Sequence, residues 1–249
     1  SDLNEFRLTA DELREKITDK TKLLVLPYPN NPTGAIMRRE DLEAIAKVLK
    51  DTNIMIASDE IYSELTYSGK HCSIAEIEGM RERTIVINGF SKSFAMTGWR
   101  LGFLGGPKEI VSQMLKLHQY AIMSSPTVSQ YAAIVAMHSC QKDIDAMRNE
   151  YNIRRRFVVD SFNKLGLKCF APQGAFYVFP CIKSTGMTST DFCEKLVYTK
   201  KVAVVPGDAF GECGEGYVRV SYAYSLNHLR EAIKRIGEFL EDIKNGNVQ

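Results

Sequence analysis

Four side chains with reactive or anion-binding groups stand in short polar segments that follow apolar runs. Lys92 carries a primary amine, Asp59 a carboxylate, and Arg100 and Arg219 guanidinium groups that can grip anions. Lys92 lies 33 positions after Asp59 and eight before Arg100. Taken singly, each has an ordinary explanation, because an acidic residue at a strand end usually caps a helix and a lone lysine is usually solvated. Their order and spacing together indicate a chemical site.

The segments that hold these residues each lie at or just beyond the carboxyl end of a predicted strand, or within one. An α/β fold binds its ligands at such strand ends. The segments are Pro-Asn-Asn-Pro-Thr-Gly at 29–34, Asp-Glu-Ile-Tyr at 59–62, Ser-Lys-Ser at 91–93 continuing to Arg100, and Arg219 inside a strand.

The first half of the chain alternates strand-like and helix-like patterns. Short apolar runs predict strands, and apolar residues at helical spacing in 39–50 predict a helix between the first two. Such alternation indicates a mostly parallel α/β sheet with right-handed crossovers. The predicted strands are 23–26, 54–57, 84–87 and 101–104.

The pattern changes after Pro107. Helices are predicted at 108–121, 126–140 and 143–165, and the last is long enough to link two lobes. Beyond Gly166, strands are predicted at 176–179, 202–205 and 218–221, with helices at 190–199 and 227–243. We therefore expect a large domain at 1–160 and a smaller α+β C-terminal domain at 161–249.

The motifs resemble those of the class I and II aminotransferases of fold type I, enzymes that use pyridoxal 5′-phosphate (PLP). The matching text is N-P-T-G, then D-E-x-Y, then S-K-x-x-x-x-x-G-x-R, then a late arginine; Gly-Ala-Phe-Tyr at 174–177 and Val-Pro-Gly at 205–207 also match. The resemblance runs from about Phe6 to Leu240. It implies the PLP-transferase fold and a cofactor held by Lys92 as a Schiff base.

The resemblance also implies a role for each site residue. Lys92 holds the cofactor and then moves the substrate proton, while Asp59 keeps the pyridine nitrogen protonated. Tyr62 and Asn31 donate to the phenolic oxygen, and Arg100 with Ser91 binds the phosphate. Arg219 binds the α-carboxylate of an amino acid or 2-oxo acid substrate, and Asn31 also contributes to substrate binding.

The N-P-T-G motif comes much earlier here than in family members, so we expect a C-terminal fragment of a longer enzyme, with the N-terminal part of the large domain missing. Transfer of an amino group between an amino acid and a 2-oxo acid is the leading expectation. A PLP-dependent C–S β-lyase and a non-catalytic fragment remain alternatives. Which amino acid donates is left open.

Composition excludes few classes but favours an ordinary globular protein. Formal net charge is +2, from 32 basic and 30 acidic residues, so nothing calls for nucleic acid or an anionic membrane. No apolar run is long enough to span a bilayer. Six scattered cysteines, without C-x-x-C pairs or histidines at metal-ligand spacing, favour reduced thiols and no metal site. We expect a cytoplasmic enzyme and, by resemblance, a homodimer.

Overall fold

The computed structural model describes residues 2–247 and divides into two compact units. The sheet unit comprises Arg7–Asn30 and Ala35–Arg148. The C-terminal unit comprises Asn149–Gln249 with the short segments Ser1–Phe6 and Asn31–Gly34. The boundary between these units falls inside one long helix, α6 (Gln141–Lys164). The division into domains 1–160 and 161–249 stays a prediction.

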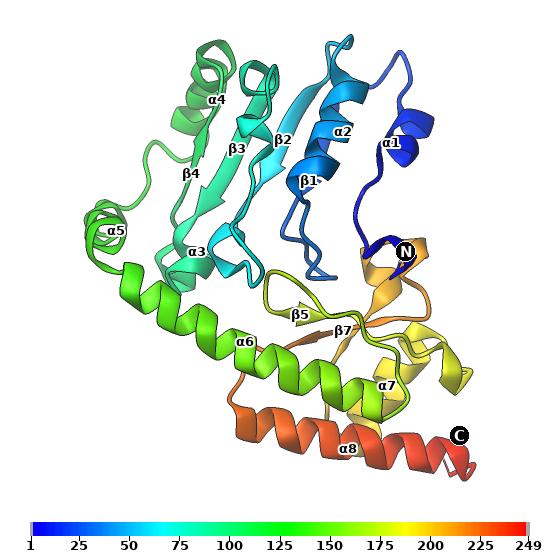
Figure 1. Cartoon of the computed structure of the whole chain (residues 1–249). Helices are drawn as coiled ribbons and strands as arrows, with labels where there is room; N and C mark the ends of the chain where they lie inside the picture. The colour runs from blue at the N-terminus through cyan, green and yellow to red at the C-terminus, as the bar shows by residue number, and fades with distance from the viewer. Residues whose placement is uncertain (1, 248–249) are drawn as a thin grey trace. The chain divides into compact units, whose positions relative to one another are not determined.

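The sheet unit is built on four strands in the order β1-β2-β3-β4 (Figure 1). Strands β1 (Leu23–Pro27), β2 (Met55–Asp59) and β3 (Thr84–Gly89) pair in parallel, and β4 (Gly102–Gly105) pairs antiparallel with β3. The prediction of a mostly parallel sheet is confirmed. The antiparallel direction of β4 was not foreseen, because the apolar run at 101–104 carries no sign of direction.

Helix α2 (Arg39–Leu49) supplies the crossover between β1 and β2, as predicted. Its buried Leu42, Ile45 and Leu49 form one core with Leu26 of β1 and Ile56 of β2. Each of these side chains is at most 2% exposed, so together they hold the helix against the strands. The shorter helix α1 (Ala10–Lys16) begins at a Thr9 capping box and adds Leu13 to this core.

The connection from β2 to β3 is irregular, unlike the α-helix that joins β1 to β2. It consists of three single 3₁₀ turns, at Ser63–Leu65, Ile74–Glu76 and Arg81–Arg83. Ile74 lies buried in the same core as α2, so this irregular segment still covers the sheet. From β3 to β4 the chain passes through α3 (Phe90–Ser93) and a 3₁₀ turn at Thr97–Trp99.

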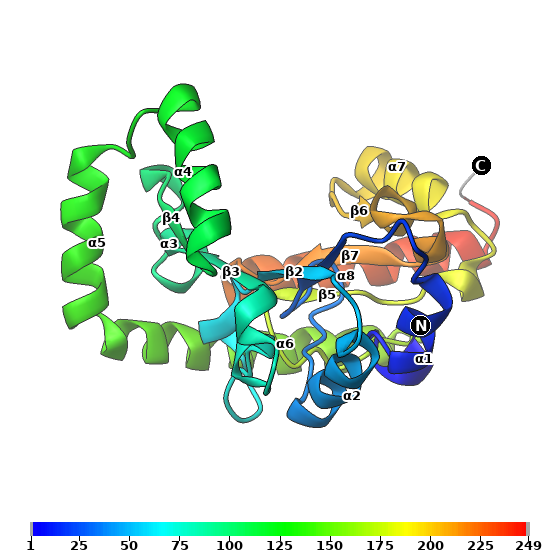
Figure 2. The same cartoon turned by 90° about the horizontal axis from the view of Figure 1, so that it is seen from above.

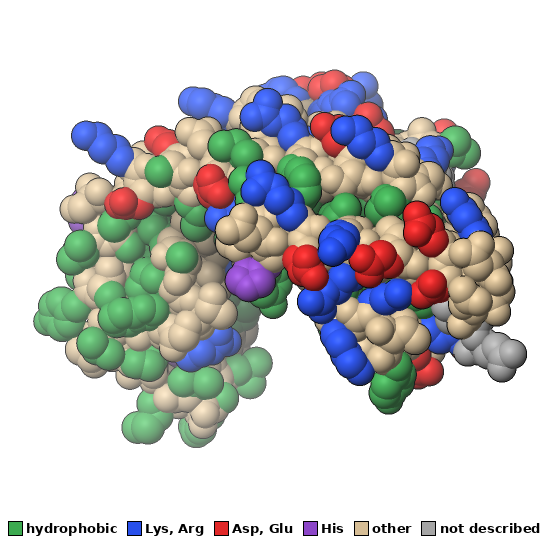
Figure 3. Space-filling view, turned by 90° about the horizontal axis from the view of Figure 1, so that it is seen from below, with side chains coloured by type: hydrophobic (Ala, Val, Ile, Leu, Met, Phe, Trp, Pro, Cys, Tyr) green, Lys and Arg blue, Asp and Glu red, His purple; other side chains and the backbone are tan. Residues whose placement is uncertain are grey.

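Helices α4 (Lys108–Ala121) and α5 (Thr127–Ser139) follow β4 at nearly the predicted positions (Figure 2). They leave many apolar side chains exposed, including Leu117 at 73% and Tyr120 at 95%. Figure 3 shows apolar side chains gathered on the side of the molecule where these helices lie. Exposed apolar surface of this extent is typical of an interaction surface. The other large apolar side chains exposed on this surface are Leu115, Ile122, Met123, Val128, Tyr131, Ile134, Val135 and Met137.

The C-terminal unit is an α+β layer, as predicted. Its three-stranded antiparallel sheet has the order β5-β7-β6, from β5 (Tyr177–Val178), β6 (Val205–Pro206) and β7 (Val218–Ser221). Strands β5 and β6 are shorter than the predicted 176–179 and 202–205, and β6 begins only at the end of its predicted range.

Two helices, α7 (Ser189–Lys200) and α8 (Leu226–Lys244), cover this small sheet. Phe192 of α7 and Phe239 of α8 are both almost fully buried and meet edge to face at 5.2 Å. Ser189 fixes the start of α7, since its hydroxyl donates to the Tyr217 carbonyl at 2.9 Å and accepts from the Gly216 amide at 2.8 Å. These contacts tie α7 to the chain that leads into β7.

Candidate active site

Asp59 and Lys92 come from neighbouring parallel strands of the sheet unit. Asp59 is the last residue of β2, and it lies opposite Ile87 of β3. Lys92 lies in α3, which begins directly after β3 ends. Because parallel strands end at the same edge, the strand register delivers the carboxylate and the amine to the same edge of the sheet.

The turn after β2 presents Asp59 and Tyr62. An Asp59 carboxylate oxygen accepts a hydrogen bond from the Ile61 amide at 3.2 Å, which fixes the start of the turn. Tyr62 is only 6% exposed, and the Lys92 Nζ lies 5.9 Å from the centre of its ring. This distance is typical of a cation–π contact. The Tyr62 ring therefore lines the space beside the Lys92 amine.

Two glycines allow the end of β3, just before Lys92, to lie very close to β4. Gly89, at the start of α3, pairs with Gly102 of β4. A Cβ on Gly89 would come within 3.1 Å of the Gly102 Cα and 3.2 Å of the Leu101 carbonyl oxygen. Contacts this short are tighter than most Cβ atoms make, so the close approach of the two backbones favours glycine on both strands.

Ser91 and Arg100 lie on the same short stretch between β3 and β4. The Thr97 hydroxyl donates to the Ser91 carbonyl at 3.1 Å, and the Arg100 guanidinium donates to the Thr97 carbonyl at 2.9 Å. Arg100 has a left-handed backbone (φ 51°) and its side chain is exposed. Thr97 thus joins the two residues that were predicted to bind a phosphate, a link that the sequence spacing alone did not show.

Asn31 and Arg219 meet within the C-terminal unit, although 188 positions separate them. The Arg219 guanidinium donates to the Asn31 side-chain oxygen at 2.9 Å. It also lies between two rings, 4.8 Å from the centre of Tyr177 and 4.9 Å from that of Phe210. Such contacts hold a guanidinium in one orientation. The two aromatic residues were not singled out from the sequence, and the Gly-Ala-Phe-Tyr motif was the only signal for Tyr177.

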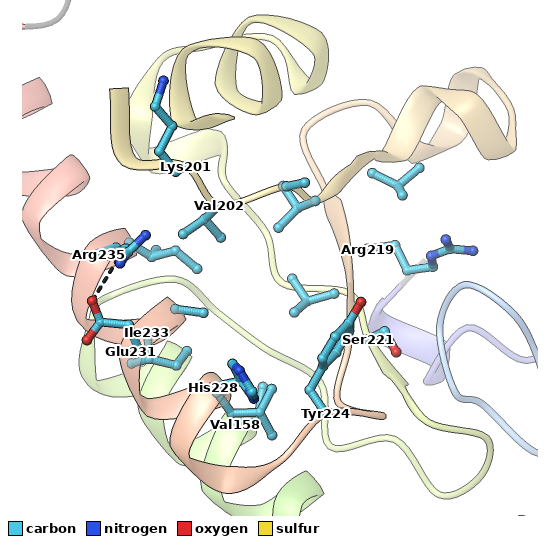
Figure 4. Close-up of a pocket in the computed structure, with 17 residues that line it drawn as sticks. Val158, Lys201, Val202, Arg219, Ser221, Tyr224, His228, Glu231, Ile233 and Arg235 are labelled. Carbon is cyan, nitrogen blue, oxygen red and sulfur yellow. Dashed lines mark hydrogen bonds and ion pairs between the residues drawn. The ribbon is translucent and has the colours of Figure 1, made fainter. Parts of the chain in front are cut away.

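A separate cavity of about 470 Å³ lies behind Arg219, between α8 and strands β6 and β7 (Figure 4). Its walls are mostly aliphatic, among them Val202, Val204 and Ile236. Figure 4 shows the Arg219 guanidinium pointing away from the centre of this cavity. The cavity is therefore distinct from the space in front of Arg219, where the guanidinium meets Asn31.

The residues of the sheet unit fit PLP in the chemistry of their donors. The cofactor has an aldehyde, a ring nitrogen, a phenolic oxygen and a phosphate, and each needs a different partner. The edge described above offers an amine at Lys92, a carboxylate at Asp59, a phenol at Tyr62 and a guanidinium at Arg100. Every type of partner that the cofactor needs is thus present on this unit.

Comparison with known proteins places the chain in a family. The family model described as aminotransferase class I and II matches residues 1–236. The chain therefore belongs to the class I and II aminotransferases, a family that uses PLP. No helix within residues 2–247 is both long and apolar enough to cross a membrane.

Several relatives carry aminotransferase names. The chain is 48% identical to the aspartate aminotransferase of Pyrococcus abyssi over 97% of its own length and 63% of that protein. It is also 48% identical to aromatic-amino-acid aminotransferase 2 of Thermococcus litoralis, with the same coverage. It thus spans a little under two thirds of the length of these relatives.

Solved structures show the same fold. The aromatic aminotransferase of Pyrococcus horikoshii superimposes with a TM-score of 0.96 at 46% identity, over 98% of this chain and 66% of that one. The aspartate aminotransferase of Thermus thermophilus, solved with maleate, gives a TM-score of 0.91 at 36% identity, over 96% of this chain and 62% of that one. The prediction of a PLP-transferase fold is confirmed.

We predict that the Asn31 segment depends on Gly34. Gly34 has φ +70°, its carbonyl accepts from the Gln173 and Gly174 amides at 2.9 Å, and an added Cβ would collide with Pro172. Gly34→Ala should lower the free energy of unfolding by about 3 kcal/mol, from backbone strain and overpacking combined. Urea denaturation measures the loss.

The control is Gly186→Ala, at φ +71° with open space around its Cβ. This change adds the backbone strain without the collision, so it should cost only about 1 kcal/mol. Equal losses in the two variants would show that Gly34 is needed for its backbone angle and not for close packing.

Proposed function

We propose that the protein is a PLP-dependent aminotransferase that moves an amino group between an amino acid and a 2-oxo acid. The observation that carries the proposal is the delivery of Lys92 and Asp59 to one sheet edge by adjacent strands, with the Tyr62 ring 5.9 Å from the Lys92 amine. Membership of the aminotransferase family supports the same reaction.

Lys92 has two roles in this proposal. Its amine first holds the cofactor covalently, and the amino group of the substrate then takes its place. The released Nζ moves a proton at the substrate α-carbon. When bound, PLP supplies an electron-accepting ring that makes this proton acidic. The same proton transfers in reverse, with a second 2-oxo acid in place of the first product, would deliver the amino group to its acceptor.

Asp59 and Tyr62 tune the bound cofactor in this proposal. The Asp59 carboxylate keeps the ring nitrogen protonated, so that the ring can take up the electrons released at the α-carbon. The Tyr62 hydroxyl, with the Asn31 amide, donates to the phenolic oxygen. Arg100 and the Ser91 hydroxyl bind the phosphate, where fixed charge and short donors are both favourable.

Arg219 binds the substrate carboxylate in this proposal. A guanidinium can form two parallel hydrogen bonds to a carboxylate, and Tyr177 and Phe210 already hold this one in a fixed orientation. Aspartate and aromatic amino acids are proposed as donors, because the relatives at 48% identity are named for them. Maleate, present in the Thermus thermophilus structure, is a suitable dicarboxylate probe of this site.

We further propose, from the family resemblance, that the enzyme is a cytoplasmic homodimer. The apolar surface of α4 and α5 supports an assembly, because exposing large apolar side chains such as Leu117 and Tyr120 to water is unfavourable. Light scattering of the purified protein tests the dimer, and a monomer at all concentrations would contradict it.

The function is tested by a half-reaction with one amino donor. Protein loaded with PLP should convert the cofactor to its pyridoxamine form when aspartate is added, seen as loss of the visible absorption band. Release of pyruvate and ammonia from cysteine would instead support a β-lyase. A wild-type protein that binds no PLP would support the non-catalytic alternative. Lys92→Ala should lose the band and nearly all turnover, because no other amine can replace it.

Asp59→Asn gives an independent test of the ring-nitrogen role. The variant should still bind PLP through Lys92, but the neutral amide cannot hold the ring nitrogen protonated. We expect kcat to fall by about three orders of magnitude with a small change in KM. A fall of less than about tenfold would show that another group protonates the ring.

A further inference from the structure

Glu60 stands between two proposed cofactor residues, yet its side chain points into the protein. It is 5% exposed, although it directly follows Asp59 at the sheet edge. Its carboxylate accepts hydrogen bonds from Ser58 at 2.9 Å and Ser73 at 2.6 Å, and a ring nitrogen of His71 lies 2.8 Å away. Acidic side chains are normally exposed to water. The burial of Glu60 and its three polar contacts therefore need an explanation.

The hydrogen bonds make this burial tolerable. A buried carboxylate without partners costs several kcal/mol. Burial alone would raise the pKa of the Glu60 carboxyl, but the hydrogen bonds from His71, Ser73 and Ser58 together bring the pKa below its usual value. The group is therefore held as a carboxylate, and each of its three partners is held by it.

The backbone of Glu60 links this network to the turn that carries Asp59 and Tyr62. The Glu60 amide donates to the Ile87 carbonyl of β3 at 2.8 Å, and the Glu60 carbonyl accepts from the Ser63 amide at 2.9 Å. Any rotation of the turn would break the hydrogen bonds between the Glu60 carboxylate and its partners. The turn is thus anchored from inside the protein as well as by the strand.

We propose that Glu60 is a positioning residue, whose carboxylate, held by Ser58, His71 and Ser73, fixes the turn that presents Asp59 and Tyr62 to the cofactor. The inference rests on the proposed function for what the turn binds, but the anchoring itself concerns this chain alone. His71 and Ser73 come from the irregular connection between β2 and β3, so this segment contributes two of the three partners of the Glu60 carboxylate.

The test compares Glu60→Gln and Ser73→Ala with the unchanged protein, first without cofactor. Hydrogen exchange of the Ile61, Tyr62 and Ser63 amides should quicken by about tenfold or more in both variants, the effect of losing one charge-assisted hydrogen bond. Ser73→Ala removes a hydroxyl that also accepts from the Ala75 amide at 3.2 Å, and it guards against a Glu60 variant that fails to fold. Glu76→Gln is the matched control, since the exposed Glu76 carboxylate binds the Ser73 amide at 3.2 Å in the same segment.

The second arm uses protein loaded with PLP and follows its visible absorption against pH. Because Asp59 and Tyr62 contact the cofactor in the proposal, the midpoint of this titration should move in Glu60→Gln and stay in place in Glu76→Gln. A role in general stability alone would not move it. Unchanged exchange in the turn, or faster exchange with an unmoved midpoint, would overturn the proposal. If the unchanged protein binds no PLP, the proposed function fails, and the exchange arm alone decides whether Glu60 anchors the turn.

Discussion

The register between β2 and β3 is the constraint on which the proposed chemistry depends. Asp59 and Lys92 are 33 positions apart, and only the parallel pairing of two strands brings the ends of their segments to one edge. A slip of one residue would turn the side chains of β2 to the opposite face. The core formed by Ile56 with Leu42 and Leu49 of α2 opposes such a slip, because it would expose Ile56.

Close backbone contact and a buried charge help to fix the positions of the residues that the strand register brings to this edge. The Gly89–Gly102 pair lets the chain that carries Lys92 lie tightly against β4. The Glu60 carboxylate holds the neighbouring turn from within. In the C-terminal unit a different principle operates, since Tyr177 and Phe210 orient the Arg219 guanidinium through their rings. Residues without a proposed chemical role, such as Glu60 and Phe210, thus help to hold the proposed site residues in place.

Much of this architecture could be predicted from the sequence, and the errors have physical reasons. Helix α4 matches its predicted range of 108–121, because helical periodicity and the preceding proline are local signals. The direction of β4 and the 3₁₀ connection after β2 depend on tertiary pairing, which apolar runs do not encode. The run 202–205 is similar: Val202 and Val204 line a cavity instead of extending β6.

Some residues of the candidate site could likewise be predicted from the sequence, and others could not. Motif spacing predicted roles for Asp59, Lys92 and Arg219, because those residues stand in the order of the family motifs. It could not identify Glu60, which in the sequence is simply the second of two acidic residues. Its burial depends on donors 11 and 13 positions further along a segment with no regular structure. Contacts of that kind become visible only when the chain is folded.

The central claim is that Lys92 is the residue that binds the cofactor, and one chemical measurement tests it most directly. Borohydride reduction of the PLP-loaded protein, followed by proteolysis and mass spectrometry, shows which lysine carries the cofactor. We predict that the label is found on the peptide that contains Lys92 and on no other. A stoichiometric label on a different lysine, with Lys92 unmodified, would contradict the account.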